Sequence, residues 1–104
     1  MDRKALREVK RFVARVKKDY RIVKAIFFGS RTGKDWLRDS DVDVILVSPD
    51  FRGIFFTDRM SRMYAYWKSK YALEVLCYTP EEFEKKSKQI SIVKEALRKG
   101  IEIT

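Results

Sequence analysis

Apolar residues recur every three or four positions along the first 20 residues of the chain. Leu6, Val9, Phe12, Val13 and Val16 are separated by charged side chains. This spacing places them on one face of a helix, as is typical of an amphipathic helix packed on a core. The pattern predicts a helix from about residue 2 to residue 19.

Three shorter apolar runs are rich in β-branched and aromatic residues, and these predict strands over residues 22–28, 42–47 and 71–78. The first run ends at Gly29-Ser30 and the second at Ser48-Pro49-Asp50, both of which favour turns. We expect Ser30 to begin a short helix reaching about residue 37, although Gly33 weakens it.

Three further helices and a short terminal segment complete the pattern. An apolar stripe predicts a helix from residue 57 or 58 to about residue 68. Thr79-Pro80-Glu81-Glu82 has the residues of a capping box and predicts the start of another helix. A last helix is expected over residues 91–99, and residues 101–103 form either a short strand or a docked tail.

The order of these elements predicts the fold class. Helices alternate with strands, so we expect an α/β (α+β) fold, a small mixed β-sheet with helices packed on one side. The chain has 104 residues, of which 45% are hydrophobic. This length predicts a single domain over residues 1–104, large enough for one core.

The composition excludes several kinds of catalysis. The chain has no histidine and one cysteine, Cys77, within a predicted strand. Ser-His-Asp and Cys-His mechanisms are therefore excluded, and a conventional zinc site is disfavoured. The single cysteine, the charged N-terminus and the absence of a long apolar run favour a cytoplasmic protein with no membrane segment. Chemistry must come from carboxylates, Lys, Arg, hydroxyls and bound metal.

The net charge of +9 favours polyanionic partners such as nucleic acid, a nucleoside triphosphate or an acidic protein surface. Lys17, Lys18, Arg21 and Lys24 form one candidate basic cluster. The alternative is that most of these cations simply solvate helix faces. Abundant Lys, Arg and Glu with few amide residues also resemble a thermophile's composition.

Three acidic residues lie within apolar strand sequences. Asp41 and Asp43 alternate with valines, so both carboxylates leave the strand on one face, roughly 6–7 Å apart at their Cα atoms. Glu74 joins them if its strand is the neighbour. Carboxylates at this spacing suit Mg²⁺, which removes their mutual repulsion. Alternatively, Asp41 belongs to a polar turn, Asp43 faces solvent and Glu74 lies on an exposed edge.

Gly29-Ser30 comes where an apolar strand meets a predicted helix. Glycine allows close approach of a phosphate to the backbone, and the start of a helix presents free N–H groups. Arg31 and Lys34 supply positive charge. The turn therefore predicts a triphosphate site that faces the carboxylates.

Together, Phe28-Gly29-Ser30-Arg31 and Asp39-Ser40-Asp41-Val42-Asp43-Val44 resemble the signature of the DNA polymerase beta-like nucleotidyltransferase superfamily. The resemblance is greatest to its minimal nucleotidyltransferase branch and extends over about residues 10–78. It implies a polymerase beta-like palm fold, a nucleoside triphosphate donor (usually ATP) and two Mg²⁺ ions. A nucleotidyl group would pass to a hydroxyl, with release of pyrophosphate.

The resemblance also implies residue roles. Gly29 and Ser30 would hold the β- and γ-phosphates, Asp41 and Asp43 the metals, and Glu74 would be the third carboxylate. Two departures stand out: the family often has Asp at the position of Glu74, and often Arg-Gly where this chain has Thr32-Gly33-Lys34.

Three functions remain open from the sequence. The first is an active nucleotidyltransferase acting on a protein or RNA, as the antitoxin of a helical HEPN-type partner. The second is a non-enzymatic partner-binding module of the same fold, and the third is a basic nucleic-acid-binding protein. Ile54-Phe55-Phe56 is either a partner contact or part of the core. So short a chain also suggests a partner protein or self-association into a homo-oligomer.

Overall fold

The computed structural model describes residues 1–89 and 91–103, so residues 90 and 104 of the expected domain lie outside it. Its centre is a four-stranded sheet in the order β3-β2-β1-β4. β1 pairs antiparallel with both β2 and β4, whereas β2 and β3 are parallel. The sheet is therefore mixed, as expected. The strands are β1 (Lys24–Phe28), β2 (Val42–Val47), β3 (Leu73–Tyr78) and β4 (Ile101–Glu102).

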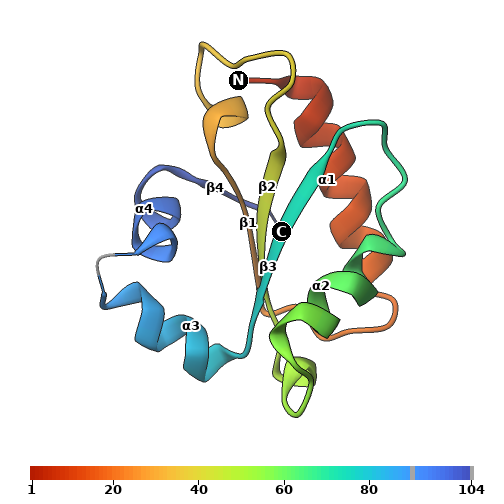
Figure 1. Cartoon of the computed structure of the whole chain (residues 1–104), viewed down its shortest axis with the longest axis vertical. Helices are drawn as coiled ribbons and strands as arrows, with labels where there is room; N and C mark the ends of the chain where they lie inside the picture. Colours follow the sequence, from red (N-terminus) through yellow and green to blue (C-terminus); the bar gives the residue numbers. More distant parts are fainter. Residues whose placement is uncertain (90, 104) are drawn as a thin grey trace.

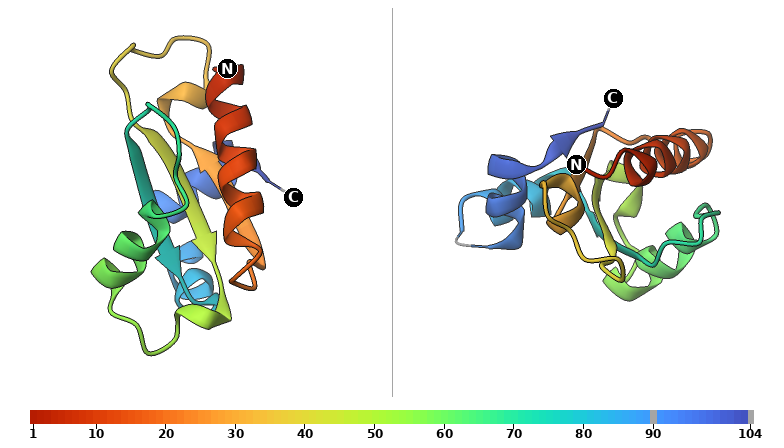
Figure 2. Two further views of the ribbon diagram at one scale, coloured as in Figure 1. Left: turned by 90° about the vertical axis from the view of Figure 1, so that its right-hand side faces the viewer. Right: turned by 90° about the horizontal axis from the view of Figure 1, so that it is seen from above.

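Helices cover both faces of this sheet, as Figure 1 and the view from above in Figure 2 show. α1 (Arg3–Val16) and α2 (Phe56–Tyr64) lie on one face, and α3 (Pro80–Ser87) and α4 (Ile92–Lys99) on the other. The expected α/β class is confirmed, but the expectation of helices on one side is wrong. The strands are apolar at consecutive positions, so each face buries side chains and needs its own cover.

The two faces form two cores from alternate strand residues. On the α1 side, Phe27, Val44 and Val75 are fully buried in one cluster with Phe12. On the α3 and α4 side, Ile45 packs in a second cluster with side chains of those two helices. Its other buried members are Ile26, Phe28, Val47, Tyr78, Phe83, Val93 and Ala96.

Side-chain caps fix the start of several helices, α1 and α3 among them. The carboxylate of Asp2 accepts a hydrogen bond from the backbone N–H of Ala5 (3.1 Å) and so caps α1. Thr79 and Glu82 form the capping box expected at the start of α3, in which each side chain accepts from the backbone N–H of the other residue. These caps satisfy N–H groups that a helix cannot pair internally.

The connection from β1 to β2 differs from the expectation. The helix expected from Ser30 to about residue 37 is a single 3-10 turn, η1 (Ser30–Thr32), which ends at Gly33 in an extended conformation. A second such turn, η2 (Pro49–Phe51), follows β2.

Residues 101 and 102 form a strand, β4, which was one of the two alternatives expected for the end of the chain. Among the described helices, none has the length and apolarity needed to cross a membrane.

Candidate active site

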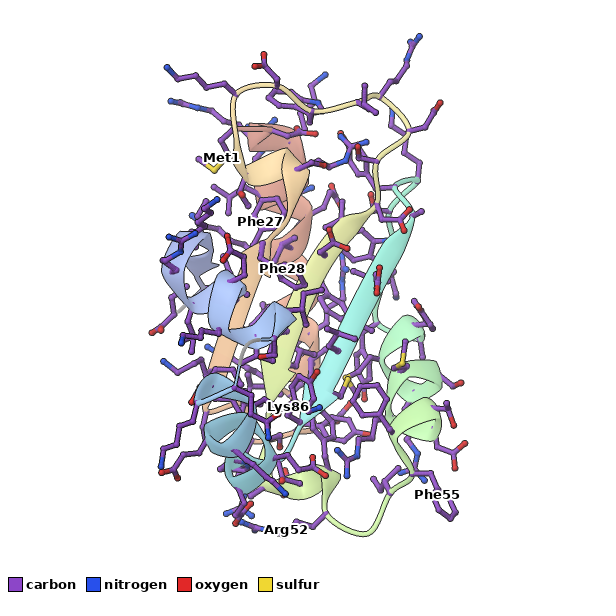
Figure 3. The ribbon with its side chains drawn as sticks, turned by 60° about the vertical axis from the view of Figure 1, so that its left-hand side comes forward. Met1, Phe27, Phe28, Arg52, Phe55 and Lys86 are labelled. Atoms are coloured by element: carbon purple, nitrogen blue, oxygen red, sulfur yellow. The ribbon has the colours of Figure 1, made fainter. Side chains whose placement is uncertain are left out.

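Two of the three predicted carboxylates meet at one end of the sheet. Asp43 on β2 is the register partner of Glu74 on the adjacent parallel strand β3. Partners on neighbouring strands lie about 5 Å apart and point to the same face. That face is the one covered by α3 and α4, because Val42 and Val44 on either side of Asp43 belong to the opposite core. Figure 3 views this face of the molecule.

The environment of Asp43 disfavours its charged form. Partial burial, and then the negative charges of Glu74 and Asp41, raise the pKa of Asp43 from 3.8 to about 6. A hydrogen bond between protonated Asp43 and Glu74 adds to the shift. A partly buried acid whose pKa is raised toward neutral by its acidic neighbours marks a candidate functional site, and a cation beside Asp43 would relieve the repulsion.

Asp41 is close enough to act on Asp43 electrostatically, yet it lies just outside β2 and is exposed. In residues 1–89 and 91–103, no three acidic or cysteine side chains lie close enough together to hold a metal ion. The structure thus brings Asp43 and Glu74 together directly and leaves Asp41 at the rim. The hard oxygen donors of Asp43 and Glu74 fit a divalent cation of the Mg²⁺ type.

Gly29 fits directly against this pair. Its φ of +89° lies in the region that favours glycine. A Cβ at residue 29 would overlap Oδ2 of Asp43 and lie 3.1 Å from its Cγ. Phe28, labelled in Figure 3, is the register partner of Asp43 and sets this approach. The phosphate-binding turn predicted from the sequence therefore adjoins the carboxylates.

A cavity of about 640 Å³ joins the turn to the carboxylates. It is lined by Ser30, Asp43 and Glu74 and also by α4, through Ile92 and Lys99. The Lys99 ammonium lies 3.1 Å from Glu95 Oε1, which also borders the cavity. No local pattern in the sequence places α4 at this site, because only the tertiary fold brings residues 92–99 against the Gly29 turn.

Arg31 does not occupy the position expected of a phosphate contact. Its side chain is 4% exposed and pairs with Asp2 at 2.5 Å. It also donates to the backbone carbonyls of Ser40 and Arg38 and stacks on the ring of Tyr71. These contacts anchor the loop before β2 to the start of α1, so its guanidinium is already satisfied inside the protein.

Two other predicted roles change in the structure. Lys34 is exposed and is not among the residues that line the cavity. The turn at Ser30 is too short to have the dipole of a helix, so phosphate binding would depend on local N–H groups and the Ser30 hydroxyl.

Cys77 lies in the core and has no part in the site. Burial raises the pKa of its thiol to about 12, which makes it unreactive.

Comparison with known proteins supports the class that this site suggests. A family model for the nucleotidyltransferase domain matches residues 9–99, and the chain therefore belongs to this family. The fold is similar to that of a Sulfolobus solfataricus protein provisionally described as a nucleotidyltransferase, with a TM-score of 0.66 and 21% identity. The likeness covers 81% of this chain and 75% of that one, and it bears on the fold alone. None of the curated proteins compared is significantly similar in sequence.

Proposed function

We propose that this chain transfers a nucleotidyl group from a nucleoside triphosphate, ATP in the first instance, to a hydroxyl, as a member of the minimal nucleotidyltransferase branch. The observation that supports this most is the apposition of Gly29, Asp43 and Glu74 around one cavity. It puts the glycine turn, with Ser30, beside the paired acids on the wall of one cavity. The family supports nucleotidyl transfer in general.

Asp43 and Glu74, which the fold brings together, would hold Mg²⁺ together with phosphate oxygens of the triphosphate, and Asp41 would contribute from the rim of the site. The Mg²⁺ ions would supply positive charge where the phosphates gather negative charge. Ser30 and the backbone of the turn would hold the β- and γ-phosphates, and Lys99 would offset their charge from α4. No histidine is needed for this arrangement.

In the proposed reaction, the acceptor oxygen forms a bond to the α-phosphorus while the bond from that phosphorus to the bridging oxygen breaks. Pyrophosphate leaves with the electron pair of that bond. The proton of the acceptor hydroxyl passes to a Glu74 carboxylate oxygen, which is exposed on the strand and so accessible to an acceptor. Holding the reactants in line supplies much of the rate enhancement.

The test is transfer of label from α-labelled ATP, with Mg²⁺, to RNA or to a candidate protein acceptor. We expect Asp41→Asn with Asp43→Asn to abolish labelling, since both acids are lost while the apolar strand remains. Asp58→Asn removes one exposed acid that lines neither this cavity nor a neighbouring one and should label as the wild type does. Labelling by the double variant at the wild-type rate would refute the site.

A partner protein is a second part of the proposal. The segment Ile54-Phe55-Phe56 was expected to be either a partner contact or part of the core. Phe55 is 81% exposed and Phe56 38% exposed, so the segment is not part of the core. Figure 3 shows Phe55 projecting away from the body of the molecule. A helical HEPN-type partner would cover such an apolar group.

The partner contact is testable by co-purification with a helical protein encoded next to this gene. Phe55→Ala should weaken the complex, whereas Val23→Ala, at a residue 61% exposed, should not. If the Asp41→Asn, Asp43→Asn variant neutralises the partner as well as wild type does, the chain acts as a binding module. If it fails to neutralise the partner, the chain acts as an enzyme.

A further inference from the structure

Six cationic side chains from three separate segments of the chain gather around two adjoining cavities. The cavities have volumes of about 830 and 490 Å³ and share Lys4, Lys70 and Tyr71 in their walls. They lie beside the start of α1, the loop before β2 and the segment before β3. We call the set the basic surface; its members are Arg3, Lys4, Arg7, Arg38, Lys68 and Lys70.

The charges of the basic surface are not neutralised within the protein. Across residues 1–89 and 91–103, none of its six cations takes part in an ion pair. Of the acids that line the same cavities, Asp2 is paired with Arg31 and Glu8 with Arg11. Asp39 alone among the lining acids has no cation partner in the described part of the chain. The surface therefore attracts anions.

The basic cluster predicted from the sequence is a poorer candidate. Arg21 pairs with Asp50 (3.1 Å) and Lys24 with Glu102 (2.9 Å). Only Lys17 and Lys18 of that cluster remain outside the ion pairs of the described residues. Cations that are adjacent in sequence are thus half neutralised, whereas those brought together by folding are not.

Two aromatic residues lie within the basic surface. Trp36 lines the larger cavity and is 37% exposed, so part of its indole is open to a ligand. Tyr71 lines both cavities, and its ring stacks on Arg31 with the guanidinium carbon 4.9 Å from the ring centre. Aromatic rings among cations can stack on the unpaired bases of a nucleic acid. An acidic protein has no bases to stack, so these rings favour a nucleic acid as the ligand.

We propose that the basic surface binds single-stranded nucleic acid. The phosphates pair with the six cations, and a base stacks on Trp36. Ser40 and Ala72, which line the larger cavity, immediately precede Asp41 and Leu73. A bound strand is therefore led toward the end of the sheet where Asp43 and Glu74 lie. Its use as acceptor rests on the proposed function; its binding does not.

The binding test is fluorescence anisotropy with end-labelled RNA and DNA strands of about 20 nucleotides, which exceed the ~4–16 nucleotides of compact single-strand sites. We expect Lys4→Gln, Arg7→Gln, Lys70→Gln to weaken binding at least tenfold at moderate salt. The slope of log affinity against log salt is negative and should become shallower by about 2, since three phosphate contacts are lost. The RNA and DNA arms show which strand is preferred.

The matched control is Lys17→Gln, Lys18→Gln, Lys85→Gln, which removes the same charge at exposed positions that line neither cavity. It should retain most of the affinity. Equal weakening by both triple variants would overturn the proposal, because net charge rather than this surface would then be responsible.

Stacking separates a nucleic acid from other polyanions. Trp36→Ala should weaken strand binding about fivefold or more, and Leu37→Ala, the more exposed neighbour, should not. Neither should affect binding of inorganic polyphosphate. No effect of Trp36→Ala on strand binding, or duplex bound as tightly as single strand, would overturn the proposal. The Asp41→Asn, Asp43→Asn variant should bind RNA normally, so loss of transfer and loss of binding are distinguishable.

Discussion

The carboxylate of Asp43 occupies the space where residue 29 would carry a Cβ, so the Gly29 turn and the acid pair are built against each other. This contact joins a backbone turn on one strand to a side chain on its antiparallel neighbour. Substitution at either residue therefore disturbs the same site.

Gly29→Ala should abolish nucleotidyl transfer. The methyl group displaces the Asp43 carboxylate, and the positive φ adds strain of about 1 kcal/mol or more. Gly53→Ala is the matched control, because Gly53 has a φ of +77° but open space around its Cβ position. In urea denaturation, Gly53→Ala should lose only the stability that the backbone strain costs, Gly29→Ala at least as much, and only Gly29→Ala should lose transfer. Full activity in Gly29→Ala would contradict the close fit.

Asp43→Asn should stabilise the metal-free protein at pH 8 but hardly at pH 3.5. The pKa of Asp43 is about 6 in the folded chain against an ordinary 3.8. The folded state therefore binds this proton more tightly, and the stability that protonation contributes is fully present below about 3.8 and is lost as pH rises from there through about 6. Because solvent screens part of the carboxylate, we expect a gain of about 1 kcal/mol.

Urea denaturation in EDTA at the two pH values measures this difference, with Asp39→Asn as the control at an exposed acid. An equal effect of Asp43→Asn at both pH values would show that repulsion among the acids is absent. Added Mg²⁺ should stabilise wild type and not the variant.

Arg31→Met should destabilise the fold by about 3 kcal/mol or more, because it leaves the Asp2 carboxylate buried and unpaired. Adding Asp2→Asn removes the uncompensated charge and should restore part of the loss. Thermal or urea unfolding measures both variants. Weaker ATP binding by Arg31→Met at unchanged stability would return Arg31 to the phosphate site.

Lys99→Gln should weaken binding of ATP with Mg²⁺ about fivefold, because it removes a cation from the cavity wall without leaving a buried charge. Lys34→Gln, at a residue outside that wall, should change affinity little. A thermal-shift titration with ATP, with and without Mg²⁺, compares the two. A larger effect from Lys34 than from Lys99 would favour the contact implied by the sequence.

The sequence alone predicted the principal helices and strands and the acids. Period and composition placed the first helix, the three principal strands and the capping box at Thr79, because these depend on local spacing and local hydrogen bonds. Alternation along one strand placed Asp43 opposite to its valine neighbours. The motifs at Gly29-Ser30 and Asp41-Val42-Asp43 together predicted a nucleotidyltransferase, and the family model for that domain confirms this.

Other features depended on which segments meet in space. The sequence did not show that α3 and α4 cover the second face, because a continuous apolar strand does not reveal which helix will bury each side. It assigned Arg31 to phosphate because an arginine beside a glycine turn is indistinguishable locally from one that reaches back to Asp2.

The positions of Lys99 and of the basic surface could not be predicted from the sequence for the same reason. Lys99 is 70 positions from Gly29, and the cations at residues 3–7, 38 and 68–70 are neighbours only after folding. Local sequence therefore determined which side chains carry the chemistry of the carboxylates and the turn. The tertiary structure decided which charges are satisfied internally and which remain open to a ligand, because a charge pairs with whatever the fold brings within a few ångströms of it.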